Sequence, residues 1–273
     1  MKGGFARPVT RRAFQRALAG GLSAAAAGAA GALRIGIGAY TYHNLSVEAM
    51  IEQLRALQVT EIEMSRGEFM NFNNPPLAMF QSFRSKIDAA GIRCVSYYAP
   101  TIRQESDVDT AIVFARALGC SHISGDPVGP ILKYVDERLT AERLTFGIHN
   151  HYFQGRKFDY ESPEDILRSL EGLSATVGCT LDLGHIFSCG FDTLDAVRKL
   201  GPRLKLIHLK DIQASGGEVN VMLGSGKCRI PEVMRELRRI GFQGLVALEY
   251  EKDGDINDEV RQQLAYARRL AVR

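Results

Sequence analysis

Four short clusters in the second half of the chain combine histidines with carboxylates. They are His149-Asn150-His151, Asp182-Leu183-Gly184-His185, His208-Leu209-Lys210-Asp211 and Glu249-Tyr250-Glu251. Together they hold four of the six histidines of the chain. Imidazoles combined with carboxylates form a donor set that suits a divalent transition metal and leaves room for substrate oxygens. The clusters therefore indicate a metal site, provided that the fold brings them together.

The elements that must position these clusters alternate regularly along the chain. Short apolar runs alternate with stretches of helical periodicity, giving eight strand–helix units of about 30 residues in residues 33–273. The expected strands are 33–39, 60–64, 93–98, 120–124, 144–149, 176–183, 204–209 and 244–250. This alternation predicts a parallel sheet, and eight units of this length predict a single (β/α)8 TIM barrel. An open doubly wound sheet is the alternative, but the first strand lacks a glycine-rich dinucleotide turn.

In a barrel of this kind the chemistry lies at the carboxyl ends of the strands. His149, Asp182, His208 and Glu249 belong to the expected strands five to eight, at or near their ends. Taken singly, a histidine at such a position is more often a loop residue whose hydrogen bonds are made within the protein, and a glutamate is more often exposed to solvent. Four such residues at matching positions in four consecutive units predict one metal site.

From residue 33 onward the sequence resembles the xylose isomerase-like TIM-barrel superfamily, in its sugar phosphate isomerase and epimerase group. The motifs that carry the resemblance are Asp182-x-x-His185, Ile207-His208-Leu209-Lys210-Asp211, Leu223-Gly224-Ser225-Gly226 followed by Ile230-Pro231, and Gly244-x-x-x-x-Glu249. The resemblance implies one divalent ion, Mn²⁺ first and otherwise Zn²⁺, Fe²⁺ or Co²⁺, held by Asp182, His208, Glu249 and residue 149. The family has a glutamate at that last place, where this chain has His149, an imidazole that disfavours Mg²⁺.

The resemblance also implies an enzyme that acts on a small-molecule sugar. We expect a metal-dependent isomerase or epimerase of a sugar or keto-sugar that works through an enediolate, with Glu249 and His185 moving the proton. His151, Lys210 and His43 are the expected substrate contacts, and His151 is an alternative to His185 for the proton. For Lys210, an ion pair with Asp211 or another acid near the strand end is an equal alternative. Because His149 replaces one carboxylate, two alternatives stay open: a metal-dependent lyase or glycoside-cleaving enzyme on keto-sugars, and a non-catalytic sugar-binding protein.

Three further features have weaker functional interpretations. Glu63, in the second expected strand, suits either a substrate contact or an internal ion pair. The backbone of residues 224–227 could bind an anion, although a tight turn is the preferred interpretation. The five cysteines form no CxxC pair, and several lie beside apolar runs, which indicates small buried side chains.

Residues 1–32 have the composition of a targeting segment. Arg11 and Arg12 precede a stretch dominated by alanine and glycine, and Ala30-Gly31-Ala32 offers a small-x-small cleavage site. This start resembles a bacterial twin-arginine signal peptide, and its stretch is too short and too weakly apolar for a stable membrane span. We therefore expect export to the periplasm, with a cytoplasmic location as the alternative. Export argues against a phosphorylated sugar substrate.

The charge balance argues against nucleic-acid binding. Residues 1–32 hold five basic residues and no acidic residue, which leaves 29 basic against 31 acidic residues in the remainder. A slightly acidic body lacks the clustered cations that bind a phosphate backbone. The apurinic endonucleases of the same superfamily need such a basic face together with more metal ligands, so we do not expect that activity. The sequence sets no oligomeric state.

Overall fold

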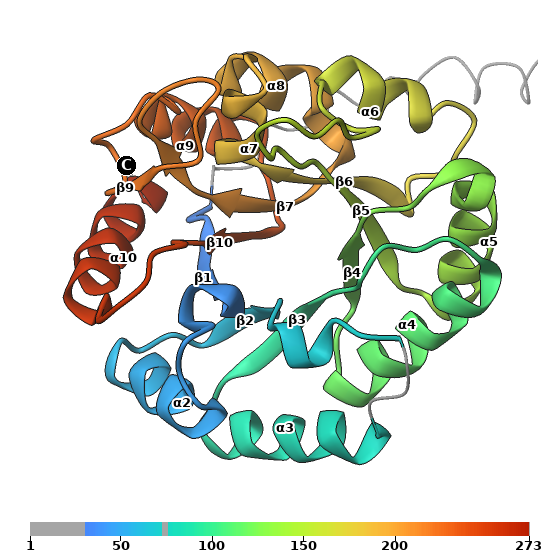
Figure 1. The fold of residues 1–273 in the computed structure, drawn as a ribbon, viewed down its shortest axis with the longest axis horizontal. Coiled ribbons are helices and arrows are strands. Elements are labelled where there is room, and N and C mark those ends of the chain that lie inside the picture. Colours follow the sequence, from blue (N-terminus) through green and yellow to red (C-terminus); the bar gives the residue numbers. More distant parts are fainter. Residues whose placement is uncertain (1–30, 73–75, 273) are drawn as a thin grey trace, which may run out of the picture. The chain divides into compact units, whose positions relative to one another are not determined.

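Eight parallel strands form a closed barrel in the computed structural model, which describes residues 31–72 and 76–272 (Figure 1). The strands are β1 (Arg34–Gly38), β2 (Glu61–Met64), β3 (Arg93–Tyr98), β4 (His122–Gly125), β5 (Thr145–His149), β6 (Val177–Asp182), β7 (Leu204–Leu209) and β10 (Leu245–Leu248). Around the barrel they follow the order β1, β10, β7, β6, β5, β4, β3, β2. The predicted TIM barrel is therefore confirmed, and each expected strand is present to within a few residues.

Helices surround this barrel and connect consecutive strands (Figure 1). They are α2 (Val47–Ala56), α3 (Leu77–Ala89), α4 (Glu105–Leu118), α5 (Leu132–Glu142), α6 (Pro163–Ser169), α8 (Thr193–Leu200), α9 (Ile230–Arg239) and α10 (Asn257–Ala271). Local signals set several ends: Ser46 and Ser162 cap α2 and α6 through their side chains, and Gly119 ends α4 with a φ of +76°. Among the described residues, no helix has the length and apolar character needed to cross a bilayer.

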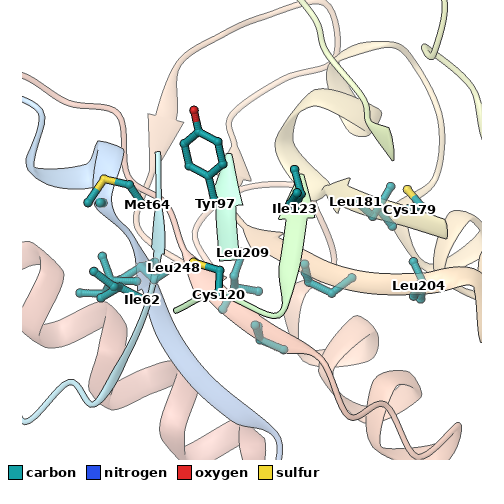
Figure 2. Close-up of a cluster of buried hydrophobic side chains, with 14 of the residues drawn as sticks. Ile62, Met64, Tyr97, Cys120, Ile123, Cys179, Leu181, Leu204, Leu209 and Leu248 are labelled. Atoms are coloured by element: carbon teal, nitrogen blue, oxygen red, sulfur yellow. The ribbon is translucent and has the colours of Figure 1, made fainter. Parts of the chain in front are cut away.

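Strand side chains that point away from the barrel axis form the main hydrophobic core under the helices. Figure 2 shows part of this layer, including Ile62, Tyr97, Leu181 and Leu248 from four different strands. Tyr97 illustrates the alternation, because its ring packs edge-on against Phe80 while its neighbour Tyr98 faces the opposite side, near His149. The apolar side chains of each strand thus pack against the helices.

The inside of the barrel is unusually polar for this architecture, in which branched apolar side chains usually dominate. Glu63, which is fully buried, accepts hydrogen bonds of 2.7 Å from the hydroxyls of Ser96 and Ser124. Ser124 lies 2.8 Å from the Thr180 hydroxyl, which in turn lies 3.3 Å from Nε2 of His122. A buried polar network is tolerated only when its members are hydrogen-bonded, and this one is connected across four strands.

Two elements beyond the barrel were not expected from the sequence. Helix α7 (Leu183–Ser188) follows β6 directly, because the Asp182 side chain accepts a 2.8 Å hydrogen bond from the backbone N–H of His185 and so caps it. A small hairpin of β8 (Asp211–Ile212) and β9 (Asn220–Val221) lies in the connection between β7 and α9. The expected leader, apart from its last two residues, lies outside the described residues.

Candidate metal and substrate site

Strand order and register bring the predicted site residues together at one mouth of the barrel. Strand β7 lies between β6 and β10, and His208 pairs in register with Asp182 on one side and Ala247 on the other. Glu249 follows Ala247 by two residues and therefore points to the same side of the sheet. His149 ends β5, the strand on the far side of β6.

The side chains of His149, Asp182 and His208 converge closely enough to bind one ion. One donor atom from each lies within 4.8 Å of the others, and all three residues are buried. Nε2 of His149 is 3.0 Å from Nδ1 of His208, whereas two donors on one tetrahedral zinc ion are about 3.4 Å apart. Glu249 lies at the edge of this group, with Oε2 3.3 Å from Nδ1 of His208. Small side-chain shifts would therefore complete the predicted four-residue set.

A buried excess of negative charge shows that these residues fit a cation. Asp182 is fully buried, and nitrogens of His208, His185 and His149 lie 3.6–4.0 Å from its Oδ2. Lys210 is the single lysine in the cluster, and its Nζ lies 3.0 Å from Asp182, 3.1 Å from Glu249 and 2.8 Å from Glu251. Counting Glu63, the site holds four carboxylates against Lys210 and one protonatable histidine, His208. Burying unbalanced charge is costly, so a divalent cation would stabilise this cluster.

The two predicted carboxylate ligands have pKa values shifted in opposite directions. Burial raises the pKa of Asp182, but the charges of His185, Lys210 and His208 hold it well below its ordinary value. Burial also raises the pKa of Glu249, and there the lowering effects of Lys210 and His208 do not reverse the shift. Asp182 is therefore a permanent anion, whereas Glu249 takes and releases a proton closer to neutral pH.

The histidines of the site differ in the same way. Burial lowers the pKa of His149 well below its ordinary value and lowers the pKa of His185 to about 3, so both imidazoles are neutral near pH 7. Burial also lowers the pKa of His208, but Glu249 and Glu63 raise it well above its ordinary value. His208 must lose a proton before it can bind a metal, so metal binding should strengthen as pH rises.

Glu63 stands directly behind His208 and forms a buried ion pair with Nε2 of that residue. This contact keeps a proton on Nε2 and turns Nδ1 toward His149 and Asp182. Burial raises the pKa of Glu63, but His208, Ser96 and Ser124 hold it below its ordinary value. The sequence left this role open, although one signal was available: strand alternation points Glu63 into the barrel, where a carboxylate needs a partner.

Asn150 and Asp211 hold backbone near the site, and sequence reasoning assigned this role to neither of them. Asp182 donates its backbone N–H to Oδ1 of Asn150 at 2.8 Å, and Asn150 donates from Nδ2 to the Asp182 carbonyl at 3.1 Å. The Asp211 carboxylate accepts from the backbone N–H groups of Ile212, Gly224, Gly226 and Cys228 at 2.8–3.1 Å. The amides of the glycine-rich turn are thus used internally, which favours the tight-turn interpretation over a phosphate cradle.

A pocket of about 210 Å³ opens beside the metal-binding cluster. Its lining includes Tyr40, Tyr98, His151, Phe153, His185 and Glu249. Two of the expected substrate contacts lie elsewhere. Nδ1 of His43 lies 2.9 Å from the Tyr40 carbonyl and its Nε2 faces Asp253, whereas Lys210 is only 1% exposed and occupied by its ion pairs. His151 and His185 therefore remain the histidines beside the cluster that face a ligand-sized space.

Comparison with known proteins agrees with this architecture. The family model described as the xylose isomerase-like TIM barrel matches residues 47–270, and the chain belongs to that family. Curated relatives from Mycobacterium tuberculosis (strain ATCC 25618 / H37Rv) and Mycobacterium bovis are uncharacterised proteins, each 39% identical over 70 residues. The match spans 26% of this chain and only 25% of each relative, so it carries no statement about activity.

Solved structures share the fold at low sequence identity. A D-psicose 3-epimerase determined with D-fructose has a TM-score of 0.70 and 16% identity, covering 88% of this chain and 99% of that one. The probable 3-DHS dehydratase AsbF from Bacillus anthracis has a TM-score of 0.68 and 12% identity, covering 85% and 98%. An uncharacterised protein from Parabacteroides distasonis has a TM-score of 0.65 and 21% identity, covering 86% and 97%. At these identities the likeness concerns the fold alone.

Proposed function

We propose that the protein is a metal-dependent isomerase or epimerase that acts on a sugar or keto-sugar. The observation that carries the proposal is the buried cluster of His149, Asp182 and His208 beside a pocket that Glu249 and His185 line. Membership of the xylose isomerase-like family and the epimerase among the structural neighbours support the sugar as substrate class.

The metal requirement follows from the charge of the cluster. His149, Asp182, His208 and Glu249 would hold one divalent ion, and the neutral imidazole of His149 favours Mn²⁺, Zn²⁺, Fe²⁺ or Co²⁺ over Mg²⁺. Such an ion supplies Lewis-acid polarisation of a substrate carbonyl, which acidifies the hydrogen on the neighbouring carbon. Glu63 orients His208 for this task, and Asn150 fixes the backbone of Asp182.

Proton transfer falls to His185 and Glu249, because both line the pocket beside the cluster. Burial lowers the pKa of His185 to about 3, so its imidazole is neutral but a weak base, and its position in the pocket is what supports the role. Burial raises the pKa of Glu249, which therefore retains a carboxyl proton more readily than an ordinary glutamate. His185 would take the proton from the carbon beside the carbonyl, leaving the electron pair in an enediolate. Glu249 would return a proton to that carbon, and the reverse reaction exchanges the two roles.

A lyase or glycoside-cleaving reaction on a keto-sugar is the second candidate. His149 stands where the family resemblance implies a glutamate, so the pocket lacks the symmetrical pair of carboxylates expected of a two-carboxylate epimerase. A dehydratase is also among the structural neighbours. The same proton removal by His185 would then be followed by loss of the group on the next carbon.

Metal analysis of two single variants tests the proposal. Asp182→Ala removes an anionic ligand and should cost most of the bound metal, whereas His185→Ala should keep the metal and lose turnover. The assay for turnover is incorporation of solvent deuterium into a panel of recovered sugars and keto-sugars, which reports enediolate formation whatever the product. Equal metal content in both variants, or no deuterium in any substrate of the metal-loaded wild type, would contradict the proposal.

A further inference from the structure

A second cavity of about 220 Å³ adjoins the proposed substrate pocket. The two cavities share His149 and His151 in their linings. The remainder of the second cavity comes from segments that follow β3, β4 and β5. Because the same two imidazoles border both spaces, one ligand could place its reacting part in the first cavity and a substituent in the second.

Three cationic side chains line this second cavity: Arg103, Arg156 and Lys157. None of them forms an ion pair with a carboxylate in the described part of the chain. Two acids, Asp126 and Asp159, also line the cavity, and Asp126 accepts hydrogen bonds from Tyr98 at 3.0 Å and from His151 at 2.9 Å. Three exposed cations against two acids leave a surplus of one positive charge at the border of the proposed active site.

Aromatic rings hold one of these cations in place. The guanidinium carbon of Arg156 lies 5.4 Å from the ring centre of Phe158 and 5.8 Å from that of Phe153. Phe153 in turn stacks on His151, with ring centres 5.8 Å apart and planes at 27°. A guanidinium that rests on aromatic rings keeps N–H donors available for an oxyanion, to which it binds with two parallel hydrogen bonds.

Polar atoms without partners lie at the border of the two cavities. Nδ1 of His151 and Oδ1 of Asp126 are both buried and have no hydrogen-bond partner, although Nε2 of His151 and Oδ2 of Asp126 contact each other. Buried polar atoms normally find a partner, so these two atoms point to a ligand with hydroxyl groups. A hydroxylated ligand with a negative charge would supply hydrogen-bond partners for these two atoms and a counter-ion for the cations.

We propose that the cavity lined by Arg103, Arg156 and Lys157, called here the basic subsite, binds an anionic group of the substrate. The substrate class is then an acidic sugar or keto-sugar that carries an oxyanion: a carboxylate, which is compatible with the predicted export, or a phosphate, which would contradict that prediction. This inference rests on the proposed sugar chemistry of the metal-binding cluster and adds the substituent that the substrate must carry. Neutral sugars would fill the first cavity and leave the basic subsite to water.

The test compares the affinities of three probes for the metal-loaded protein by calorimetry: 2-keto-D-gluconate, D-fructose 6-phosphate and D-fructose. We expect at least one anionic probe to bind about tenfold or more tightly than D-fructose, because one charge-assisted hydrogen bond is worth about that factor. Binding of 2-keto-D-gluconate alone would identify a carboxylate, and binding of the phosphate ester alone would identify a phosphate. Equal affinity for all three probes, or no binding of either anion, would overturn the basic subsite.

A double variant and its matched control locate the effect. Arg156→Gln with Lys157→Gln removes two charges from the basic subsite and should abolish the preference for the anionic probe. Arg55→Gln with Lys133→Gln removes two exposed charges from helices α2 and α5 and should keep the preference. A preference that survives in the first variant would refute the assignment.

Failure of this inference is distinguishable from failure of the proposed function. Metal content of the Asp182→Ala variant and deuterium incorporation do not depend on the basic subsite. If those two measurements give the expected results while the anionic probes bind no more tightly than D-fructose, the isomerase or epimerase proposal is retained and the basic subsite is refuted.

Discussion

Replacing Glu63 with glutamine should weaken metal binding about 10- to 100-fold and leave the barrel folded. In the wild type, Oε1 of Glu63 accepts hydrogen bonds of 2.7 Å from both Ser96 and Ser124, and Oε2 faces Nε2 of His208. The amide oxygen of glutamine takes the position beside the serines, which places its NH₂ group against His208. Nε2 of His208 must then accept a hydrogen bond, so the ring proton moves to Nδ1.

The size of the effect follows from this change of tautomer. Nδ1 of His208 lies 3.0 Å from His149 and 3.6 Å from Asp182, so it is the nitrogen that faces the metal-binding cluster. A protonated Nδ1 cannot bind an ion, and recovering the correct tautomer breaks the new hydrogen bond. The expected loss of 10- to 100-fold corresponds to about 1.4–2.8 kcal/mol of binding free energy.

Equilibrium dialysis against Mn²⁺ or Zn²⁺, followed by metal quantification, measures the loss. Glu236→Gln is the matched control, because Glu236 is also a buried carboxylate but pairs with Arg239 on helix α9. Thermal unfolding of both variants should remain cooperative. Wild-type metal affinity in Glu63→Gln, or an equal loss in Glu236→Gln, would refute the positioning role of Glu63.

Three further predictions concern stability and location. Burial lowers the pKa of His122 to about 4, so between about pH 6.5 and pH 4 the unfolded chain binds a proton that the folded chain does not. Stability should therefore fall by about 3 kcal/mol as pH drops through that window, and urea unfolding of His122→Gln should show a flatter pH dependence. Asp211→Ala leaves four backbone N–H groups without their acceptor and should lower the free energy of unfolding by about 2–4 kcal/mol, with new proteolytic cleavage in residues 213–227. The free energy of unfolding of Asp211→Asn should lie between those of the wild type and Asp211→Ala. If residues 1–32 direct export, changing both Arg11 and Arg12 to lysine should retain the protein in the cytoplasm, and unchanged periplasmic recovery would contradict the signal.

Much of the fold is encoded locally. The expected strands 93–98 and 204–209 coincide with β3 and β7, and Ser46 and Ser162 cap α2 and α6 by hydrogen bonds to backbone three residues away. These features depend on the period of apolar residues and on hydrogen bonds within a few residues, so a single sequence displays them. The same holds for the ends of strands five to eight, where the four predicted metal ligands stand at matching positions along the chain.

Closure of the barrel determines which side chains those residues contact. Glu63 and His208 are 145 positions apart and belong to strands that are not neighbours, so no local pattern pairs them. The sequence left Lys210 open between a substrate contact and an ion pair with a nearby acid, and the geometry surrounds it with Asp182, Glu249 and Glu251. Sequence alone therefore determined which residue types reach the mouth of the barrel. Only the tertiary structure decided which of them touch, because charge pairing and burial depend on distances across the barrel and not along the chain.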